Sequence, residues 1–213
     1  MPKIISVNQK IGNFKKIISV PGDKSLSIRW VLFSSLANGT SKAKNLLMSE
    51  DVLAAIKIIK KLGIKVNIKK NECKIFGKGI EGYKYKKNLT IDAQNSGTLG
   101  RLILGLIVNS PEPINLIGDK SLSKRDFKRV SDPLSKFGAK FKLRSNNFLP
   151  LKIYGSSKLK PIKYNENKGS AQCKSSIIFA AMRTEGITTI KAKKSRNHTE
   201  LLCKYLKLPI VIK

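Results

Sequence analysis

Apolar residues along the chain follow two spacings, and the change from one to the other outlines a series of strands and helices. Apolar residues at every second position predict strands, whereas apolar residues three and four positions apart predict amphipathic helices. In the first part of the chain this pattern predicts strand 16–20, helix 24–37, strand 40–46 and helix 50–62. Gly63 then ends the second helix, because glycine readily takes the left-handed backbone that closes a helix.

The same order of elements recurs twice more, so the chain is an internal repeat. The second copy is predicted as strand 89–92, helix 97–108, strand 113–117 and helix 126–137. The third copy is predicted as strand 160–164, helix 170–183, strand 186–191 and helix 198–207. In the first two copies the last helix leads into two strands joined by a polar turn, at 61–77 and 136–155. Each unit is therefore β-α-β-α-β-β, the third lacks its final strand, and the fold class is α/β.

A short polar motif begins the first helix of every unit. The motifs are Gly22-Asp-Lys-Ser25, Asn95-Ser-Gly-Thr98 and Gly169-Ser-Ala-Gln172, with Asp23 or Ser25 as the cap of the first helix. A capped helix start presents free backbone N–H groups and the positive end of the helix dipole, which favour an anion. Three such starts predict that the helices converge on one anionic ligand. The alternative is that the repeats share their caps by descent alone.

A basic residue follows each motif at the same distance. Arg29 comes four positions after Ser25, Arg101 four after Gly97, and Lys174 four after Ser170. Lysine and arginine are the side chains that pair best with phosphate and carboxylate groups. The spacing strengthens the prediction of an anion site at the three helix starts.

Net charge and composition narrow the class of ligand. The formal net charge is +30, but it comes from 36 lysines spread along the whole chain and only 7 arginines. This spread, without any nucleic-acid-binding motif, argues against nucleic acid as the ligand and favours a small anion. Because arginine is scarce, each one that is kept indicates a need for its planar, bidentate guanidinium.

Cysteine spacing and hydropathy argue against a disulfide-bonded, a zinc-binding or a membrane-spanning protein. Cys73, Cys173 and Cys203 lie far apart and form no C-x-x-C pair, which argues against disulfides and a zinc site and fits a reducing cytoplasm. We expect no metal and no cofactor. No apolar run approaches the ~20 residues of a membrane span, and the N-terminus has no signal-peptide core, so we expect no membrane association.

Five motifs, in this order and spacing, resemble the 5-enolpyruvylshikimate-3-phosphate synthase family. They lie at 21–29, 95–101, 118–125, 170–175 and 195–200. The resemblance implies an inside-out α/β barrel domain built from three repeat units. It also implies transfer of the enolpyruvyl group of phosphoenolpyruvate to the 5-hydroxyl of shikimate 3-phosphate, with release of phosphate and without a cofactor. Both substrates are anions, which agrees with the basic motifs.

The resemblance also assigns roles to individual residues. It implies shikimate 3-phosphate contacts from Lys24, Ser25, Arg29, Ser170, Gln172 and Arg196. It implies phosphoenolpyruvate contacts from Lys24, Gly97, Arg125 and Gln172. Supporting roles fall to Asn95, Thr98 and Arg101, of which Arg101 could instead be a structural salt-bridge partner. His198 begins a helix and is expected to cap or pack rather than to act as a base. The resemblance assigns no catalytic residue to this chain, and Lys24 is the one candidate.

Two departures from the family pattern fall beside the phosphoenolpyruvate contacts. Gln94 stands where glycine usually precedes the Asn-x-Gly-Thr run, and Asp126 replaces the proline that usually follows Arg125. Glycine and proline fix particular backbone angles. Without them, the family pattern does not determine the loop conformation at these two positions.

The family enzyme is about twice this length, with two similar domains and a site between them. We expect segment 1–12 to associate with the missing second domain, and 13–213 to form one domain with units at about 13–80, 81–157 and 158–213. The missing domain normally supplies the acid–base residues, so the chain is expected to be poorly active alone. The alternatives are a half that needs a separate partner chain, or a non-catalytic polyanion-binding protein. The full-length enzyme is expected to be a monomer.

Overall fold

The structure is a computed structural model that describes residues 6, 22–70 and 72–212, so the predicted strand 16–20 lies outside the described residues. The first part holds α1 (Lys24–Leu36), β1 (Asn38–Lys44), α2 (Glu50–Lys61), β2 (Lys65–Lys69) and β3 (Glu72–Lys78). The middle holds β4 (Leu89–Asp92), α3 (Gly97–Leu106), β5 (Ile114–Ile117), η1 (Leu122–Lys124), α4 (Lys128–Ser135), β6 (Lys140–Arg144) and β7 (Phe148–Tyr154). The last part holds β8 (Lys163–Glu166), α5 (Ala171–Ala181), β9 (Thr189–Ala192) and α6 (His198–Tyr205).

Each described sheet takes its strands from one part of the chain. The sheet order is β1-β3-β2 in the first part, β4-β5-β7-β6 in the middle and β8-β9 in the last. β4 pairs with β5 in parallel across α3, and β8 pairs with β9 in parallel across α5. The returning strands β3 and β7 pair antiparallel with β1 and β5. The predicted unit boundaries near 80 and 157 stay predictions.

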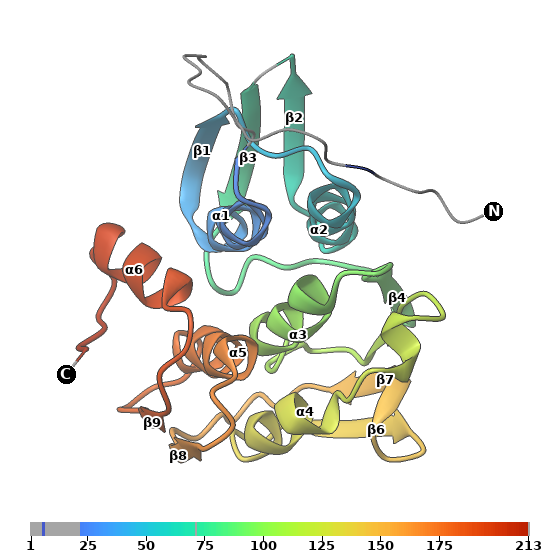
Figure 1. The fold of residues 1–213 in the computed structure, drawn as a ribbon, viewed down its shortest axis with the longest axis vertical. Helices are drawn as coiled ribbons and strands as arrows, with labels where there is room; N and C mark the ends of the chain where they lie inside the picture. Colours follow the sequence, from blue (N-terminus) through green and yellow to red (C-terminus); the bar gives the residue numbers. More distant parts are fainter. Residues whose placement is uncertain (1–5, 7–21, 71, 213) are drawn as a thin grey trace.

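Helices α1, α3 and α5 gather at the centre of the molecule, with the sheets towards the outside (Figure 1). Their sequences contain few charged residues, because nearly every face of these helices is buried. Phe33 of α1 and Phe179 of α5 pack with ring centroids 4.8 Å apart. Gly105 lets α3 approach α5 closely, since a Cβ there would lie 2.1 Å from the Ser176 carbonyl oxygen. These central helices fix the spacing of the helix starts.

The observed boundaries differ from the predicted ones where glycine or proline interrupts a strand. β8 begins at Lys163 instead of 160, after Pro161, which has no N–H to donate to a sheet. β9 begins at Thr189 instead of 186, because Gly186 has φ +92° and Ile187 is 87% exposed. The predicted helix 126–137 is shorter, at Lys128–Ser135, and follows the 3-10 turn η1.

Candidate functional site: an arginine-lined cavity at three helix starts

Three helix N-termini are capped by side chains that the polar motifs supply. Asp23 Oδ1 accepts a 2.7 Å hydrogen bond from the backbone N–H of Leu26 at the start of α1. Ser96 caps α3 and Ser170 caps α5 in the same way, with hydroxyl oxygens 3.3 and 3.2 Å from backbone nitrogens three residues on. Since Asp23 rather than Ser25 takes the capping role, the Ser25 hydroxyl is free for another contact.

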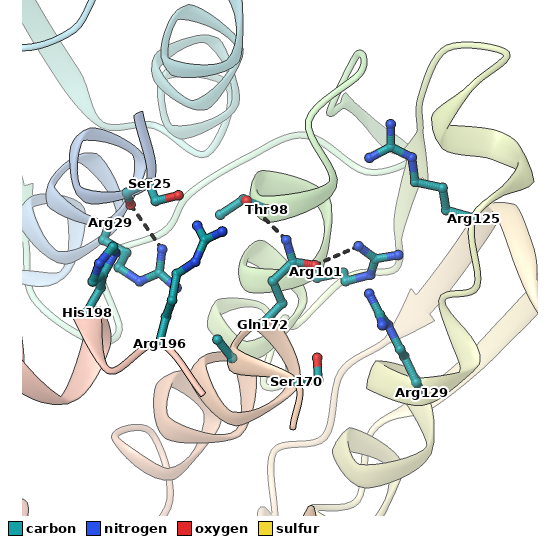
Figure 2. A pocket seen from close by; sticks show the side chains of 11 residues that line it. Ser25, Arg29, Thr98, Arg101, Arg125, Arg129, Ser170, Gln172, Arg196 and His198 are labelled. Carbon is teal, nitrogen blue, oxygen red and sulfur yellow. Dashed lines mark hydrogen bonds between the residues drawn. The ribbon is translucent and has the colours of Figure 1, made fainter. Parts of the chain in front are cut away.

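The second residue of each capped helix lines one shared cavity. Ser25, Thr98 and Gln172 occupy this position in α1, α3 and α5, and all three line a cavity of about 430 Å³ (Figure 2). Ser170 and Ala171 also line it. The helix starts therefore do converge, as the repeats predicted. A cavity of this size lies within the range of small-molecule sites, roughly 300–1,000 Å³.

Arginine dominates the charged lining of the cavity. Five of the seven arginines of the chain line it: Arg29, Arg101, Arg125, Arg129 and Arg196. Among the described residues, no aspartate or glutamate lines it. So many guanidinium groups around a small cavity give a strongly positive potential, which suits a ligand with phosphate or carboxylate groups.

Arg29 is the most deeply held of these arginines. Its side chain is only 3% exposed and donates to Thr199 Oγ1 at 2.7 Å, to the Ser25 carbonyl at 3.0 Å and to Ser175 Oγ at 3.1 Å. Burial lowers the pKa of Arg29 below its ordinary value, and the nearby Glu200 carboxylate acts in the opposite direction. Its orientation is fixed by the protein before any ligand arrives.

Arg101 and Gln172 form a chain of hydrogen bonds across the middle of the cavity. Arg101 Nη1 donates to Gln172 Oε1 at 2.6 Å, and Gln172 Nε2 donates to Thr98 Oγ1 at 3.1 Å. Arg101 Nη2 also donates to the Asp126 carbonyl at 3.0 Å. Burial lowers the pKa of Arg101 to about 10, and the positive charges of Arg129 and Arg125 add to this effect.

Arg125 lies at the far end of the cavity and is more exposed. Its Nη2 donates to Asn95 Oδ1 at 3.2 Å and to Ser121 Oγ at 3.3 Å. Asn95 in turn donates to Asp119 Oδ2 at 2.6 Å. A Cβ on Gly97 would lie 3.0 Å from Nη1 of both Arg101 and Arg125, so glycine keeps this end open for the two guanidinium groups.

The sequence as a whole was compared with known proteins. Residues 8–212 match the family model described as EPSP synthase (3-phosphoshikimate 1-carboxyvinyltransferase). The chain belongs to this family. It is 45% identical over 204 residues to the 3-phosphoshikimate 1-carboxyvinyltransferase of Caldicellulosiruptor bescii, covering 93% of this chain and 47% of that protein. With the Bacillus cytotoxicus protein of the same name it shares 43% identity over 185 residues, covering 86% of this chain and 43% of that protein.

Solved structures agree with the family assignment. An EPSP synthase from Acinetobacter baumannii superposes with a TM-score of 0.86 at 33% identity, covering 92% of this chain and 44% of that one. The enolpyruvyl transferase NikO from Streptomyces tendae shares the fold, with a TM-score of 0.61 at 13% identity. The enolpyruvyl transferase fold predicted from the repeats and motifs is confirmed. The chain spans under half the length of the relatives it matches.

Most residues that the family resemblance singled out lie at the cavity, and Lys24 is the main exception. Ser25, Arg29, Thr98, Arg101, Arg125, Ser170, Gln172 and Arg196 line it. Gly97 and Asn95 contact its arginines. The Lys24 ammonium instead forms an ion pair with Asp51 Oδ2 at 2.8 Å, and its side chain is 52% exposed. The roles of all these residues toward substrates stay predictions.

The third basic residue of the repeat pattern also points elsewhere. Lys174 forms a buried ion pair with Glu200 and does not line the cavity. The structure explains this difference. Counted from the observed caps, Arg29, Arg101 and Lys174 are the sixth, fifth and fourth residues after the cap, so they face different directions.

Three lining residues were not predicted as site residues: Arg129, Ala171 and His198. Arg129, in the first turn of α4, was known only as one of the scarce arginines; that scarcity was the one signal that could have identified it. His198, expected to cap or pack, lines the cavity, and its Nδ1 is buried without a hydrogen-bond partner among the described residues.

The departures at Gln94 and Asp126 have distinct structural consequences. Gln94 has φ +51°, a left-handed conformation that glycine adopts without strain and other residues do not. Asp126 Oδ1 accepts hydrogen bonds from the backbone N–H groups of Lys128 at 2.8 Å and Arg129 at 3.4 Å. It thus satisfies the first turn of α4, which a proline at position 126 could not do because it has no side-chain acceptor.

In residues 6, 22–70 and 72–212, no group of three or more histidine, cysteine or acidic side chains could hold a metal ion. None of the helices in the same ranges is both long and apolar enough to cross a bilayer.

Proposed function

We propose that this chain is one substrate-binding half of a 3-phosphoshikimate 1-carboxyvinyltransferase, an enzyme of aromatic amino-acid biosynthesis. In this proposal its cavity binds shikimate 3-phosphate and contributes to the binding of phosphoenolpyruvate. The observation that carries the proposal is the cavity itself, in which five arginines meet the starts of three helices. The family membership of residues 8–212 gives this anion site its substrate class.

The two ends of the cavity fit two anionic substrates. Arg29, Arg196 and Ser25 lie together at one end, and Arg101, Arg125 and Arg129 at the other, with Gln172 between them (Figure 2). We assign the first end and Ser170 to shikimate 3-phosphate, and Arg125 with Gly97 to phosphoenolpyruvate. Guanidinium groups bind phosphate and carboxylate by paired, charge-assisted hydrogen bonds.

The cavity supports binding better than proton transfer. Enolpyruvyl transfer removes a proton from the attacking hydroxyl and delivers one to the methylene carbon of phosphoenolpyruvate, so it needs groups that exchange protons near neutral pH. Arginines stay protonated there, and among the described lining residues no carboxylate is present. His198 is the one described lining residue that can exchange protons near neutral pH, and it belongs to the first turn of α6, where we expect it to cap or pack. We therefore infer that the acid–base groups come from a second half, whether in the same chain or a partner chain. Arginine then stabilises charge in the transition state.

A cytoplasmic location belongs to this proposal. All three cysteines are free and buried, and thiols persist in a reducing compartment. The substrates are small and charged, and the complete enzyme is proposed to act as a monomer.

Calorimetric titration of shikimate 3-phosphate into the chain tests the site. Arg29 is buried and triply hydrogen-bonded, so its removal would also disturb folding. Arg196 is exposed and lines the cavity, which makes Arg196→Ala the better variant. We expect it to weaken binding at least about tenfold, because a hydrogen bond to a charged group contributes roughly 1.5–3 kcal/mol. Lys207→Ala, which removes the same charge beyond α6, should leave binding unchanged.

Equal effects of the two variants would refute the site assignment. A coupled assay of phosphate release from phosphoenolpyruvate tests the second point, because we expect negligible turnover from this chain alone. Turnover at the rate of a full-length enzyme would show that a second half is not required. Tight binding to random DNA with a steep salt dependence, and no binding of shikimate 3-phosphate, would favour a polyanion-binding protein instead.

A further inference from the structure

Arg129 differs from the other arginines of the site because it lines two cavities. It lines the 430 Å³ cavity and also a smaller one of about 220 Å³, and Ser170 is the other residue that lines both. Arg129 belongs to the first turn of α4, whereas the family motif at 118–125 ends at Arg125. In Figure 2 its guanidinium points towards Arg101 and Gln172.

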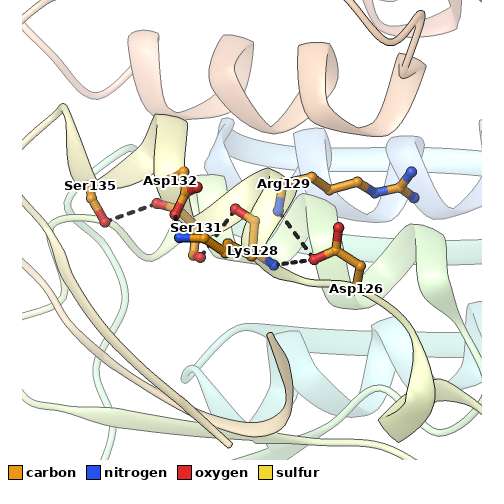
Figure 3. A network of polar contacts seen from close by, with 6 residues as sticks. All are labelled: Asp126, Lys128, Arg129, Ser131, Asp132 and Ser135. Carbon is orange, nitrogen blue, oxygen red and sulfur yellow. Dashed lines mark hydrogen bonds and ion pairs between the residues drawn. The ribbon is translucent and has the colours of Figure 1, made fainter. Parts of the chain in front are cut away.

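The polar groups around the start of α4 are already paired with one another. Asp126 accepts from two backbone N–H groups, and the Lys128 ammonium pairs with Asp132 at 2.9 Å. The Ser131 hydroxyl donates to the Lys128 carbonyl at 3.3 Å, and the Ser135 hydroxyl donates to the Ser131 carbonyl at 2.9 Å. Figure 3 shows the Arg129 side chain extending away from this network. Arg129 is therefore not a member of the surface ion pairs of its own helix.

The acids of the smaller cavity are also engaged elsewhere. Asp132 is held by Lys128, as above. Glu166 is buried, and its two carboxylate oxygens accept the backbone N–H groups of Lys168 at 3.1 Å and Ser170 at 2.8 Å. No described carboxylate pairs with the Arg129 guanidinium, so its charge is not neutralised from this side.

Arg129 and Arg101 each have a buried donor that no described group satisfies. The Nε atoms of both are buried without a hydrogen-bond acceptor in the part of the chain that the structure describes. A buried donor without an acceptor is unfavourable and calls for an explanation. The positive charge of Arg129 also contributes to the lowered pKa of Arg101, so the two guanidinium groups disfavour each other. A ligand with concentrated negative charge in the cavity would relieve the repulsion between the two guanidinium groups.

We propose that Arg129 is a further anion-binding residue of this site, which together with Arg101 and Arg125 binds the phosphate group of a phosphorylated substrate. This position lies at the end of the cavity opposite Arg29 and Arg196. Its assignment to the phosphate of phosphoenolpyruvate rests on the proposed function, whereas the anion position rests on the arginine geometry alone. A phosphate dianion can accept from several guanidinium groups at once, as this cluster requires.

Lys128 provides a matched control, because it is the adjacent residue on the same helix and carries the same charge. Its side chain is about half exposed and pairs with Asp132 outside the cavity. The variants Arg129→Gln and Lys128→Gln thus remove one positive charge each, but only the first removes a donor that lines the cavity. Arg129→Lys keeps the charge and loses the planar fork.

The experiment is a calorimetric titration of the 213-residue chain and these variants with phosphoenolpyruvate, with inorganic phosphate and with shikimate 3-phosphate. We expect Arg129→Gln to weaken binding of phosphoenolpyruvate and inorganic phosphate at least about tenfold, the loss typical of a hydrogen bond to a charged group. Lys128→Gln should change it less than about twofold, since it removes only a screened surface charge. Arg129→Lys should fall between the two.

Thermal unfolding of the same variants separates binding from structure. Because Arg129 repels Arg101 and its Nε has no acceptor within the described ranges, Arg129→Gln should unfold at the same temperature as the parent chain or higher. A purely structural arginine would show the reverse: lower stability and unchanged binding.

Three results would overturn the proposal: phosphate binding by Arg129→Gln within twofold of the parent, an equal loss in Lys128→Gln, or no measurable phosphate binding by the parent chain. Failure of the proposed function has a different signature. In that case shikimate 3-phosphate and phosphoenolpyruvate would bind no better than inorganic phosphate, while Arg129→Gln would still weaken all three.

Discussion

The close contact between α3 and α5 provides a sharp test of how the fold sets the site. A methyl group on Gly105 would lie 2.1 Å from the carbonyl oxygen of Ser176, 2.9 Å from its carbonyl carbon and 3.1 Å from Phe179 Cβ. Real Cβ atoms essentially never approach other atoms within 3.0 Å, and the Ser176 carbonyl is backbone that cannot rotate away. Gly105→Ala therefore has to push the two helices apart by about 1.4 Å, the shortfall from an ordinary van der Waals contact of roughly 3.5 Å.

The expected change in the free energy of unfolding combines two opposing terms. Replacing glycine by alanine inside a helix favours folding by about 1 kcal/mol. Overpacking a buried contact disfavours it by roughly 1–3 kcal/mol, and by more when the obstacle is rigid backbone. We expect a net destabilisation of about 2 kcal/mol. For a domain of this size that corresponds to a fall of roughly 4–8 °C in Tm.

Gly100→Ala in the same helix is the control. A Cβ there would lie 3.2 Å from Phe127 Cζ and 3.3 Å from Ala93 Cβ, contacts that a shift of a few tenths of an ångström relieves. The two terms should nearly cancel, leaving stability within about 1 kcal/mol of the parent. Urea denaturation followed by circular dichroism measures both variants. An unfolding free energy for Gly105→Ala within 1 kcal/mol of the parent would refute this account of helix spacing.

Two further predictions follow from buried groups outside the cavity. Lys174→Ala leaves Glu200 buried without its partner and should lower the free energy of unfolding by roughly 3 kcal/mol. The double variant Lys174→Met with Glu200→Leu should lose less stability, because it leaves no unpaired buried charge. Urea titrations that give equal losses for the two would contradict this. Burial raises the pKa of Cys173 and Cys203 to about 11, above their ordinary 9.0, so the stabilisation from keeping these thiols protonated is complete below pH 9 and lost as pH rises towards 11. At pH 8 both thiols should react with a disulfide reagent at least about 100-fold more slowly than in denaturant, and labelling at the denatured rate would contradict their burial.

The repeat pattern predicted the helix starts well because their chemistry is local. Ser96 and Ser170 cap their helices through atoms within three residues, and the second residue of each helix follows from the cap. Ser25, Thr98 and Gln172 could thus be placed together from sequence. The convergence of the three helices depends on repeat symmetry, which the sequence also carries.

Residues whose direction depends on distant partners could not be placed in this way. Lys24 pairs with Asp51 of α2, and Lys174 pairs with Glu200 of α6. Neither acid has a fixed spacing from its lysine in the three units, so the motifs gave no sign of these pairs. Arg129 presents the opposite case, because no motif marked it and only the packing of α4 against α5 brings it to the cavity.

Lysines and arginines have different roles in ligand binding: the lysines attract anions in general, and the arginines recognise a particular one. Lysines are spread over the chain and give most of the +30 net charge, which attracts any anion and is screened by salt. Arg29 and Arg101 are buried and held by hydrogen bonds from several elements, so their donors keep fixed directions. A rigid set of guanidinium groups distinguishes a substrate with phosphate and carboxylate at set positions from a simple polyanion. Such a ligand also relieves the repulsion of Arg101 by Arg129 and Arg125 and that of Arg29 by Arg196. Its binding should stabilise the fold by an amount that rises with the logarithm of its concentration over Kd.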